Sequence, residues 1–393
     1  MSNIPSLINT IPSLTDAARE VCSVALAHRD ETESSRKLAP AVIEQLRALQ
    51  LCRLGLPKSL GGWEDDPVEV LKIYEMLSSA EASVAWIVWN NHLACTFGRF
   101  LDEGSMKEIY GNPNDIYANS TRPEGFAKEV EGGYMVSGHW TLVSGCELAD
   151  WFVLRCLVIA EELPSKLGPG AKLKLVFLPK AAITVVDTWT VGGLRGTGSH
   201  DIKVKEIFVP KHYAVDFDTP VTIDHAYNRL PIGVMNSAGC AAMALGLVKS
   251  AADELIKIGM ERVTPGKNPD FRDRPHVQTV VANSQAIISA TRSYLYDCVT
   301  TLWKESLDGN TFSDKQLADV WAAAHQAATI ARSTLSEIYA VAGTASLYTK
   351  SPIERAHRDI HAVLQHGIIQ PHWMNQAGMA YFGITPPAPM FRI

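Results

Sequence analysis

The segment SPIERAHRDIHAVLQHGIIQP, Ser351 to Pro371, carries the strongest structural signal in this chain. Its apolar residues recur every three or four positions, which predicts an amphipathic helix over Ile353 to Gln370. His366 stands near the end of this helix, and Gly367, a residue type that commonly ends helices, follows it. Two interpretations of His366 stay open. It caps the last carbonyls of the helix, or its imidazole, which titrates near working pH, serves catalysis.

Further helices flank this segment and fill both ends of the chain. Long, Ala-rich amphipathic runs cover Ala238 to Arg262, Pro275 to Asp308 and Asp314 to Ala342, which together with the last helix predict a four-helix bundle. The N-terminal helical patterns are Ala41–Leu51, Pro67–Ser79 and Ser83–Leu101. The last of these is apolar on nearly all sides, so we expect it to be buried.

Between the helical parts lies a region typical of β-structure. From about Asn112 to Asp216, β-rich runs alternate with turns that contain Gly and Pro. The expected strands are Tyr134–Ser137, Trp151–Ile159, Lys172–Leu178 and Ile202–Val209. We therefore expect an α+β protein, with an N-terminal helical domain over residues 1–111, a central β-domain over 112–224 and a C-terminal four-helix bundle over 225–393.

The composition argues against several classes of protein. Of the 393 residues, 47% are hydrophobic and 20% are charged, as in ordinary soluble globular proteins. The net charge of -6 offers no electrostatic footprint for nucleic acid or an anionic membrane. We find no apolar run of about 20 residues and no signal peptide. The seven cysteines are scattered singly, which is typical of reduced thiols, so a cytoplasmic location is expected.

The segment that begins at Ser351 resembles the C-terminal signature of the acyl-CoA dehydrogenase superfamily, in which P-x-E-R-x-x-R-D leads into the catalytic residue. Many dehydrogenases of that family have a glutamate base nine positions after the second arginine, where this chain has Gly367 beside His366. Other members carry the glutamate in an earlier L-E-R-L string, where this chain has Asn228. The resemblance therefore implies the fold of that family without the carboxylate that removes a substrate proton.

Two segments of the central region resemble the flavin-contacting motifs of the same family. In GYMVSGHWTLVSGCELADWFVL, Gly133 to Leu154, the resemblance places the hydroxyl of Ser144 at nitrogen 5 of the flavin. In VGGLRGTGSHDIKVKEIFVP, Val191 to Pro210, it implies a flavin loop that follows a tryptophan. The cofactor contacts implied there are Trp189, Thr197 and Ser199. The plain alternatives are a turn serine and a flexible hairpin. A dinucleotide fingerprint is excluded, because a β-like run follows the glycines.

Further site residues follow from the same resemblance. The helix ASVAWIVWNNHLA, Ala82 to Ala94, resembles one that carries a histidine into the substrate cavity of oxygenating relatives. Here that residue is His92, for which a satisfied core histidine is the alternative. The expected substrate-pocket neighbours are Trp86, Trp89 and Phe97, and the cofactor set is completed by Asn119, Arg262 and Gly343. No metal is expected, because the last helix has no HExxH pattern and no cysteine pair assists.

Taken together, these motifs resemble the flavin-dependent monooxygenases of the acyl-CoA dehydrogenase fold, often called group D. The resemblance implies a two-component enzyme that receives reduced FAD, or FMN, from a separate NAD(P)H-dependent flavin reductase and combines it with O2. A flavin hydroperoxide would then hydroxylate a small, flat aromatic substrate of the indole type. His366 would hydrogen-bond the hydroperoxide or deprotonate the substrate, and Ser144 would donate to nitrogen 5. The family also implies a homotetramer.

Other functions stay open on the sequence alone. They are an acyl-CoA dehydrogenase-type flavoprotein, an N- or S-oxygenase of the same fold, and a helical binding or scaffold protein without catalysis.

Overall fold

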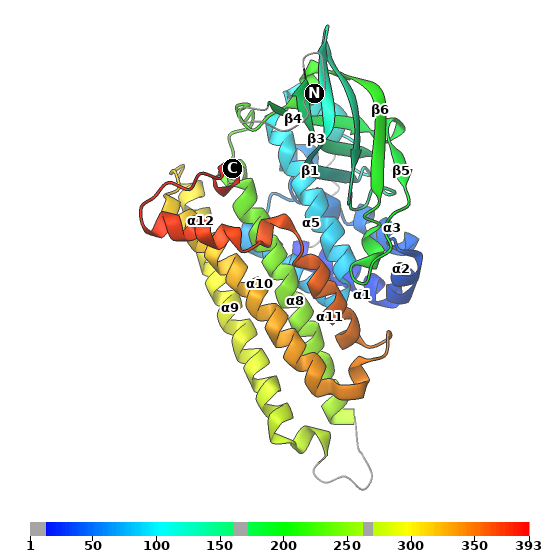
Figure 1. Ribbon diagram of the computed structural model, residues 1–393, viewed down its shortest axis with the longest axis vertical. Helices are drawn as coiled ribbons and strands as arrows, with labels where there is room; N and C mark the ends of the chain where they lie inside the picture. Colours follow the sequence, from blue (N-terminus) through cyan, green and yellow to red (C-terminus); the bar gives the residue numbers. More distant parts are fainter. Residues whose placement is uncertain (1–12, 160–171, 262–269, 393) are drawn as a thin grey trace.

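The computed structural model describes residues 13–159, 172–261 and 270–392. A β-sheet occupies one end of an elongated molecule, and the long C-terminal helices run away from it toward the other end (Figure 1). The chain is an α+β protein with N-terminal helices, a central mixed sheet and C-terminal helices, as the sequence predicts.

The N-terminal helices support one side of the molecule and supply its most buried element. They are α1 (Leu14–Ala27), α2 (Arg29–Ser35), α3 (Pro40–Ala48), α4 (Pro67–Ala80), α5 (Ala82–Thr96) and α6 (Glu103–Tyr110). All residues of α5 are buried, because the helix is surrounded by the sheet, α4 and α8. This position explains why its sequence is apolar on nearly all sides. Polar side chains on α5 are therefore exceptions that call for a partner.

The central sheet has seven strands in the described part of the chain, in the order β5-β6-β2-β1-β3-β4-β7. They are β1 (Tyr117–Val130), β2 (Gly133–Trp140), β3 (Trp151–Ile159), β4 (Leu173–Pro179), β5 (Thr184–Val186), β6 (Asp201–Pro210) and β7 (Ala214–Val215). Strands β1 and β3 pair in parallel and the other pairs are antiparallel. The four expected strands are confirmed as β2, β3, β4 and β6, although β4 begins at Leu173, one residue after the expected start.

Strand β1 was not expected from the sequence. It contains Pro123 and Gly125, which normally argue against a strand interior. The pairing of β1 with β3 is irregular between Ser120 and Gly125, so the strand accommodates both residues at a bulge. Such bulges turn side chains away from the regular alternation of a strand.

The C-terminal helices confirm most of the predicted bundle. They are α7 (Ala226–Arg229), α8 (Ile232–Glu261), α9 (Pro275–Leu307), α10 (Asp314–Ala342), α11 (Pro352–Val363) and α12 (His372–Tyr381). The prediction for the last helix of the bundle was wrong at its end, because α11 stops at Val363 rather than Gln370. The chain then forms a separate 3-10 turn, Gly367–Ile369, which begins from an extended backbone at His366.

Helix α8 corrects the expectation that no apolar run has membrane-spanning length. It is long and apolar enough to qualify, with a mean hydropathy of 1.4, but 89% of that stretch is buried inside the protein. Its apolar character therefore reflects its place in the core, where it contacts α4, α10 and α11.

Candidate active site

A cavity of about 930 Å³ lies between α5, the sheet, α8 and α11. This volume is near the upper end of the roughly 300–1,000 Å³ typical of small-molecule sites. In the described part of the chain, its lining contains no Asp or Glu. Gly367 faces open space, since no described atom beyond its two chain neighbours lies within 4 Å of the place where a β-carbon would stand. The predicted site residues that line the cavity are Trp86, Phe97, Asn119, Ser144, Trp189, Ser199 and His366.

A row of buried hydroxyl groups reaches this cavity through Ser144 and Ser199. The indole Nε1 of Trp86 donates to Ser144 Oγ at 2.9 Å, and Ser144 Oγ lies 2.8 Å from Ser199 Oγ. Ser199 Oγ lies 2.7 Å from Thr197 Oγ1, which donates to the carbonyl of Leu194 at 2.8 Å. We call this row the hydroxyl relay.

The final carbonyl sets the direction of the hydroxyl relay. Because a carbonyl only accepts and a hydroxyl has one proton, Thr197 donates to Leu194, Ser199 donates to Thr197, and Ser144 donates to Ser199. Ser144 also accepts from Trp86, which leaves its oxygen with one unused lone pair and no proton for a ligand. The sequence predicted Ser144 as a donor to the flavin. The structure instead presents it as an acceptor.

His366 lines the same cavity from the turn after α11. Its ring meets Trp86 and Trp89 edge-on, with centroids 5.7 and 5.1 Å apart. Its Nδ1 accepts a hydrogen bond of 3.2 Å from the backbone N–H of Ile368. His366 therefore caps the start of the following turn and not the last carbonyls of α11, contrary to the simpler expectation.

The protonation of His366 follows from this contact. Burial, followed by the positive charge of Arg122, lowers the pKa of His366 from 6.5 to about 4. The ring is neutral near pH 7, and because Nδ1 accepts from Ile368, its proton is on Nε2. His366 thus has an N–H donor on its second nitrogen, which suits hydrogen bonding to an oxygen better than removal of a proton.

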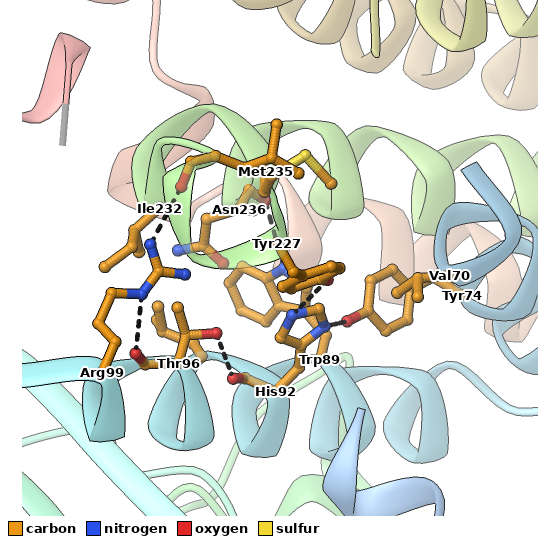
Figure 2. Close-up of a pocket in the computed structure, with 12 residues that line it drawn as sticks. Val70, Tyr74, Trp89, His92, Thr96, Arg99, Tyr227, Ile232, Met235 and Asn236 are labelled. Carbon is orange, nitrogen blue, oxygen red and sulfur yellow. Dashed lines mark hydrogen bonds between the residues drawn. The ribbon is translucent and has the colours of Figure 1, made fainter. Parts of the chain in front are cut away.

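His92 is placed in a different pocket from the one the sequence predicted. Its Nδ1 lies 2.5 Å from the hydroxyl of Tyr74, and its Nε2 lies 2.8 Å from the hydroxyl of Tyr227 (Figure 2). Burial, with a smaller contribution from Arg99, lowers the pKa of His92 to about 3. This pocket measures only about 30 Å³. Both ring nitrogens have partners, so the geometry matches the alternative of a satisfied core histidine.

The remaining predicted residues differ in how close they come to the cavity. Trp89 lines the small pocket, donates to the carbonyl of Asn236 at 3.2 Å and supports His366. Thr197 joins the site through the hydroxyl relay. Gly343 is exposed at the end of α10 and is not among the cavity residues. Arg262 lies outside the described residues. Within the described ranges, no group of three or more His, Cys, Asp or Glu is placed to hold a metal.

The P-x-E-R-x-x-R-D motif fixes the loop that carries the hydroxyl relay. Asp359 Oδ1 accepts from the backbone N–H of Leu194 at 2.7 Å, and Arg358 donates to the carbonyl of Gly192. Arg358 is itself held by both oxygens of Glu354 and by Glu33. The motif therefore positions the loop before β6, because its side chains join that loop to α11.

Asn90 and Arg122 are among the cavity residues that the sequence analysis missed. Asn90 is only 8% exposed on α5, and Arg122 stands at the β1 bulge. The one sequence signal for Asn90 is a polar residue within an apolar helix. Arg122 had no such signal, because β1 itself was not expected.

The residues present fit a flavin. The cavity is large enough for a fused ring system beside a substrate, and Ser144 offers an acceptor within it. Trp189, which donates to the carbonyl of Leu194 at 3.1 Å, adds an aromatic wall next to the relay.

Comparison with known proteins shows the family to which the chain belongs. The chain matches the family models "Acyl-CoA dehydrogenase, N-terminal domain" over residues 12–106 and "Acyl-CoA dehydrogenase, C-terminal domain" over residues 238–371. An indole-3-acetate monooxygenase of Acinetobacter baumannii is 26% identical, over 91% of this chain and 90% of that protein. HsaA of Rhodococcus jostii, the oxygenase subunit of a flavin-dependent monooxygenase, is 26% identical over 87% and 90%.

Solved structures share the fold. The 3-HSA hydroxylase from Rhodococcus sp. RHA1 has a TM-score of 0.88 at 23% identity, over 96% of this chain and 98% of that one. XiaF from Streptomyces sp., solved with FADH2 and glycerol, has a TM-score of 0.87 at 23% identity, over 95% and 96%. With both family models in the expected order and relatives matched along most of their length, the chain belongs to the acyl-CoA dehydrogenase superfamily, in its flavin-dependent monooxygenase branch.

Proposed function

We propose that this chain is the oxygenase component of a two-component system that hydroxylates a small, indole-like aromatic substrate with reduced FAD and O2, through a flavin hydroperoxide. A separate NAD(P)H-dependent reductase in the cytoplasm supplies the reduced flavin. Two of the relatives are described as an oxygenase subunit and an oxygenase component, and XiaF was solved with FADH2, which supports this assignment.

The observation that carries the proposal is the pairing of an acceptor and a donor in a cavity whose described lining has no carboxylate. A reduced flavin has an N–H at nitrogen 5, and the unused lone pair of Ser144 suits that group. The Nε2–H of His366 suits an oxygen atom that carries partial negative charge during transfer. Trp86 and Phe97 add apolar walls that exclude water, which otherwise diverts reduced flavin and O2 to hydrogen peroxide.

The same cavity is poorly suited to dehydrogenation. Gly367 faces open space, and the side chain of Asn228 donates to the carbonyl of Ile223 instead of reaching the cavity. Removal of a substrate proton α to a carbonyl needs a base within hydrogen-bond reach. Neither position supplies one.

The test combines binding and turnover. The protein is titrated with reduced FAD and with reduced FMN without oxygen, and tight binding of reduced flavin is expected. Addition of O2 and an indole, with catalase present, should then give a product one oxygen heavier by mass spectrometry. Acyl-CoA mixed anaerobically with the FAD-loaded protein should leave the flavin oxidised. Bleaching of the flavin in that mixture would contradict the proposal.

A further inference from the structure

The small pocket in Figure 2 contains a buried cation. Arg99 lies in the 3-10 turn Phe97–Phe100, directly after α5, and is only 7% exposed. Its Nε donates to the carbonyl of Thr96 at 3.2 Å. Its Nη1 donates to the carbonyls of Asn228 at 2.6 Å and Leu230 at 3.1 Å. These bonds occupy three of the five N–H groups of a guanidinium.

The third nitrogen of Arg99 opens on the pocket. No described residue accepts a hydrogen bond from Nη2, and protein atoms do not fully enclose it. In Figure 2 the guanidinium reaches from the end of α5 toward Asn236 on α8, and Nη2 carries no dashed line. Two N–H groups of a deeply buried side chain are therefore left for a ligand.

No carboxylate balances this cation in the described ranges. Arg355, which is also buried, pairs with Glu81 at 3.4 Å, whereas the residues that line the small pocket include no Asp or Glu. Burial lowers the pKa of Arg99 from 12.5 to about 10, with Tyr227 opposing the shift, so the side chain stays charged near pH 7. A buried charge without a counter-charge is strongly unfavourable, so an ion of opposite sign is expected beside it.

Arg53 shows how this fold holds a buried arginine without a bound ion. It is only 1% exposed, and both of its terminal nitrogens donate to backbone carbonyls. A carboxyl group also lies within reach of its field, because burial raises the pKa of Asp115 and the charge of Arg53 opposes that rise. Neither condition holds for Arg99 among the residues that the structure describes.

The tyrosines on either side of His92 supply one further donor. Burial, with a smaller contribution from Arg99, lowers the pKa of His92 to about 3, so its ring is neutral. A neutral imidazole donates from one ring nitrogen and accepts at the other. One of Tyr74 and Tyr227 therefore donates to His92, while the other accepts from it and keeps its own proton. That proton has no acceptor in the described part of the chain, and both tyrosines line the pocket.

The size of the pocket limits the ligand. It measures about 30 Å³. A single water needs about 10–15 Å³ by this measure, so the pocket admits about two waters or one small ion. Neither a flavin nor an aromatic ring fits. Leu93, Ile232 and Asn236 line both this pocket and the large cavity, so the two spaces share a wall.

We propose that the small pocket binds one small monovalent anion, such as chloride, held by Nη2 of Arg99 and by the spare hydroxyl proton of Tyr74 or Tyr227. The site goes beyond the proposed function, which places flavin, substrate and O2 in the large cavity. The bound anion balances the charge of Arg99 and stabilises the wall that the two spaces share.

Bromide locates the site directly, because it resembles chloride and scatters anomalously. Crystals of the full chain are soaked in sodium bromide. An anomalous peak is expected in hydrogen-bond contact with Nη2 of Arg99. Peaks that lie only on exposed side chains would mean an adventitious ion only and would overturn the proposal.

Thermal melting tests the same site in solution. Sodium gluconate, whose anion is too large for the pocket, is replaced stepwise by sodium chloride at constant ionic strength. The melting temperature of the wild type should rise with chloride and then level off as the site fills, since a ligand of the folded state stabilises it. A melting temperature that does not depend on the anion would overturn the proposal.

Variants assign the chloride response to these residues. Arg99→Gln should abolish the response. The double variant Tyr74→Phe/Tyr227→Phe keeps the bonds of Arg99 to the carbonyls and should weaken chloride by about tenfold or more, the scale of one hydrogen bond to a charged group. Arg19→Gln, a change at an exposed arginine of α1, should respond like the wild type. An undiminished response in the double variant, or in a folded Arg99→Gln, would overturn the assignment.

Reduced flavin carries phosphate, so its binding is measured with and without chloride. The affinity of the wild type for reduced FAD should not change, because the two ligands occupy different spaces. Competition between them would mean that the charge of Arg99 serves the cofactor, and the anion proposal would be wrong. Failure to bind any reduced flavin would instead contradict the proposed function and leave the bromide and chloride results as they stand.

Discussion

The backbone N–H of Leu194 donates to the buried carboxylate of Asp359 at 2.7 Å, across 165 positions of sequence. Together with the bond from Arg358 to the carbonyl of Gly192, it joins the helix that carries the family motif to the loop that ends the hydroxyl relay. Burial, with a further contribution from Glu81, raises the pKa of Asp359 from 3.8 to about 7, and the bond from Leu194 opposes that rise.

Asp359→Asn should change the pH dependence of stability. Because the folded-state pKa of Asp359 is raised, its favourable contribution is complete below about pH 3.8 and is lost as the pH rises through about 7. An asparagine still accepts from Leu194 but carries no charge. The melting temperature of the variant, relative to wild type, should therefore rise between pH 5 and pH 8. Asp359→Ala, which loses the acceptor, should be less stable at both values. Parallel curves for wild type and Asp359→Asn would refute the shift.

Ser144→Ala should keep the fold and release peroxide. The change removes one hydrogen-bond acceptor, which is worth about 1 kcal/mol or somewhat more at a polarised site. The measurement is hydrogen peroxide formed per reduced flavin consumed, which should rise. Ser199→Ala is the matched control, because it leaves the oxygen of Ser144 in place and should leak less. If Ser144→Ala forms the same amount of hydrogen peroxide per reduced flavin as wild type, Ser144 is only a turn serine.

His366→Ala should lower product formation by about 100-fold, the scale typical of a lost catalytic hydrogen-bond donor. His366→Asn, which can still cap the turn and donate a hydrogen bond, should lose less. The wild-type rate should not follow a titration near pH 6.5, since the pKa of His366 is about 4. A rate that rises with a midpoint near 6.5 and loses that limb in His366→Asn would mean that the imidazole acts as a base.

Asn90→Leu should stabilise the ligand-free protein. Among residues 13–159, 172–261 and 270–392, none donates to the Asn90 side-chain oxygen, although its helix is buried along its whole length. Replacing such a group with an apolar one of similar shape removes its desolvation cost. The melting temperature without ligand should rise. Asn91→Leu is the contrasting variant. The Asn91 amide donates to the carbonyl of Ile87 and accepts from the backbone N–H of Tyr117, so its replacement should lower the melting temperature. A lower melting temperature for Asn90→Leu would show that its oxygen has a role in the free protein.

A homotetramer is expected in solution. Large apolar side chains stay exposed on the C-terminal part of the single chain, among them Leu347 at 64%, Tyr348 at 71% and Phe382 at 86%. Burial of such groups against other subunits would lower the free energy of the assembly. Light scattering should give about four times the chain mass of 42.9 kDa. A flavin-binding monomer would rule this out.

The sequence predicted elements whose signal is local and missed features that depend on distant partners. Helix α5 was recognised as a buried helix because its consecutive residues are apolar on nearly all sides. Strand β1 was missed because Pro123 and Gly125 are residue types that normally argue against a strand. The bulge that accommodates them forms only when β1 pairs with β3, so the local sequence does not indicate it. The early end of α11 was missed because His366 caps a turn, which depends on backbone geometry and not on composition.

The sequence likewise indicated the site residues that lie in recognisable motifs, but not the contacts between them. Ser144 and His366 were found through motifs, but the direction of the relay required the carbonyl of Leu194 at its end. The partners of His92 lie 18 and 135 positions away, so only the fold could show that both of its nitrogens are occupied. Asn90 became a candidate once its lack of a donor was visible.

The fixed direction of the hydroxyl relay also has a consequence for the release of oxidised flavin. A ligand next to Ser144 must bring its own hydrogen, and oxidised flavin, unlike the reduced form, has none at nitrogen 5. On the proposed function, the serine that retains the incoming cofactor would therefore lose its bond once oxidation is complete. An oxygenase that exchanges its flavin with a reductase in every cycle needs this asymmetry, because the spent form must leave before the next one can enter.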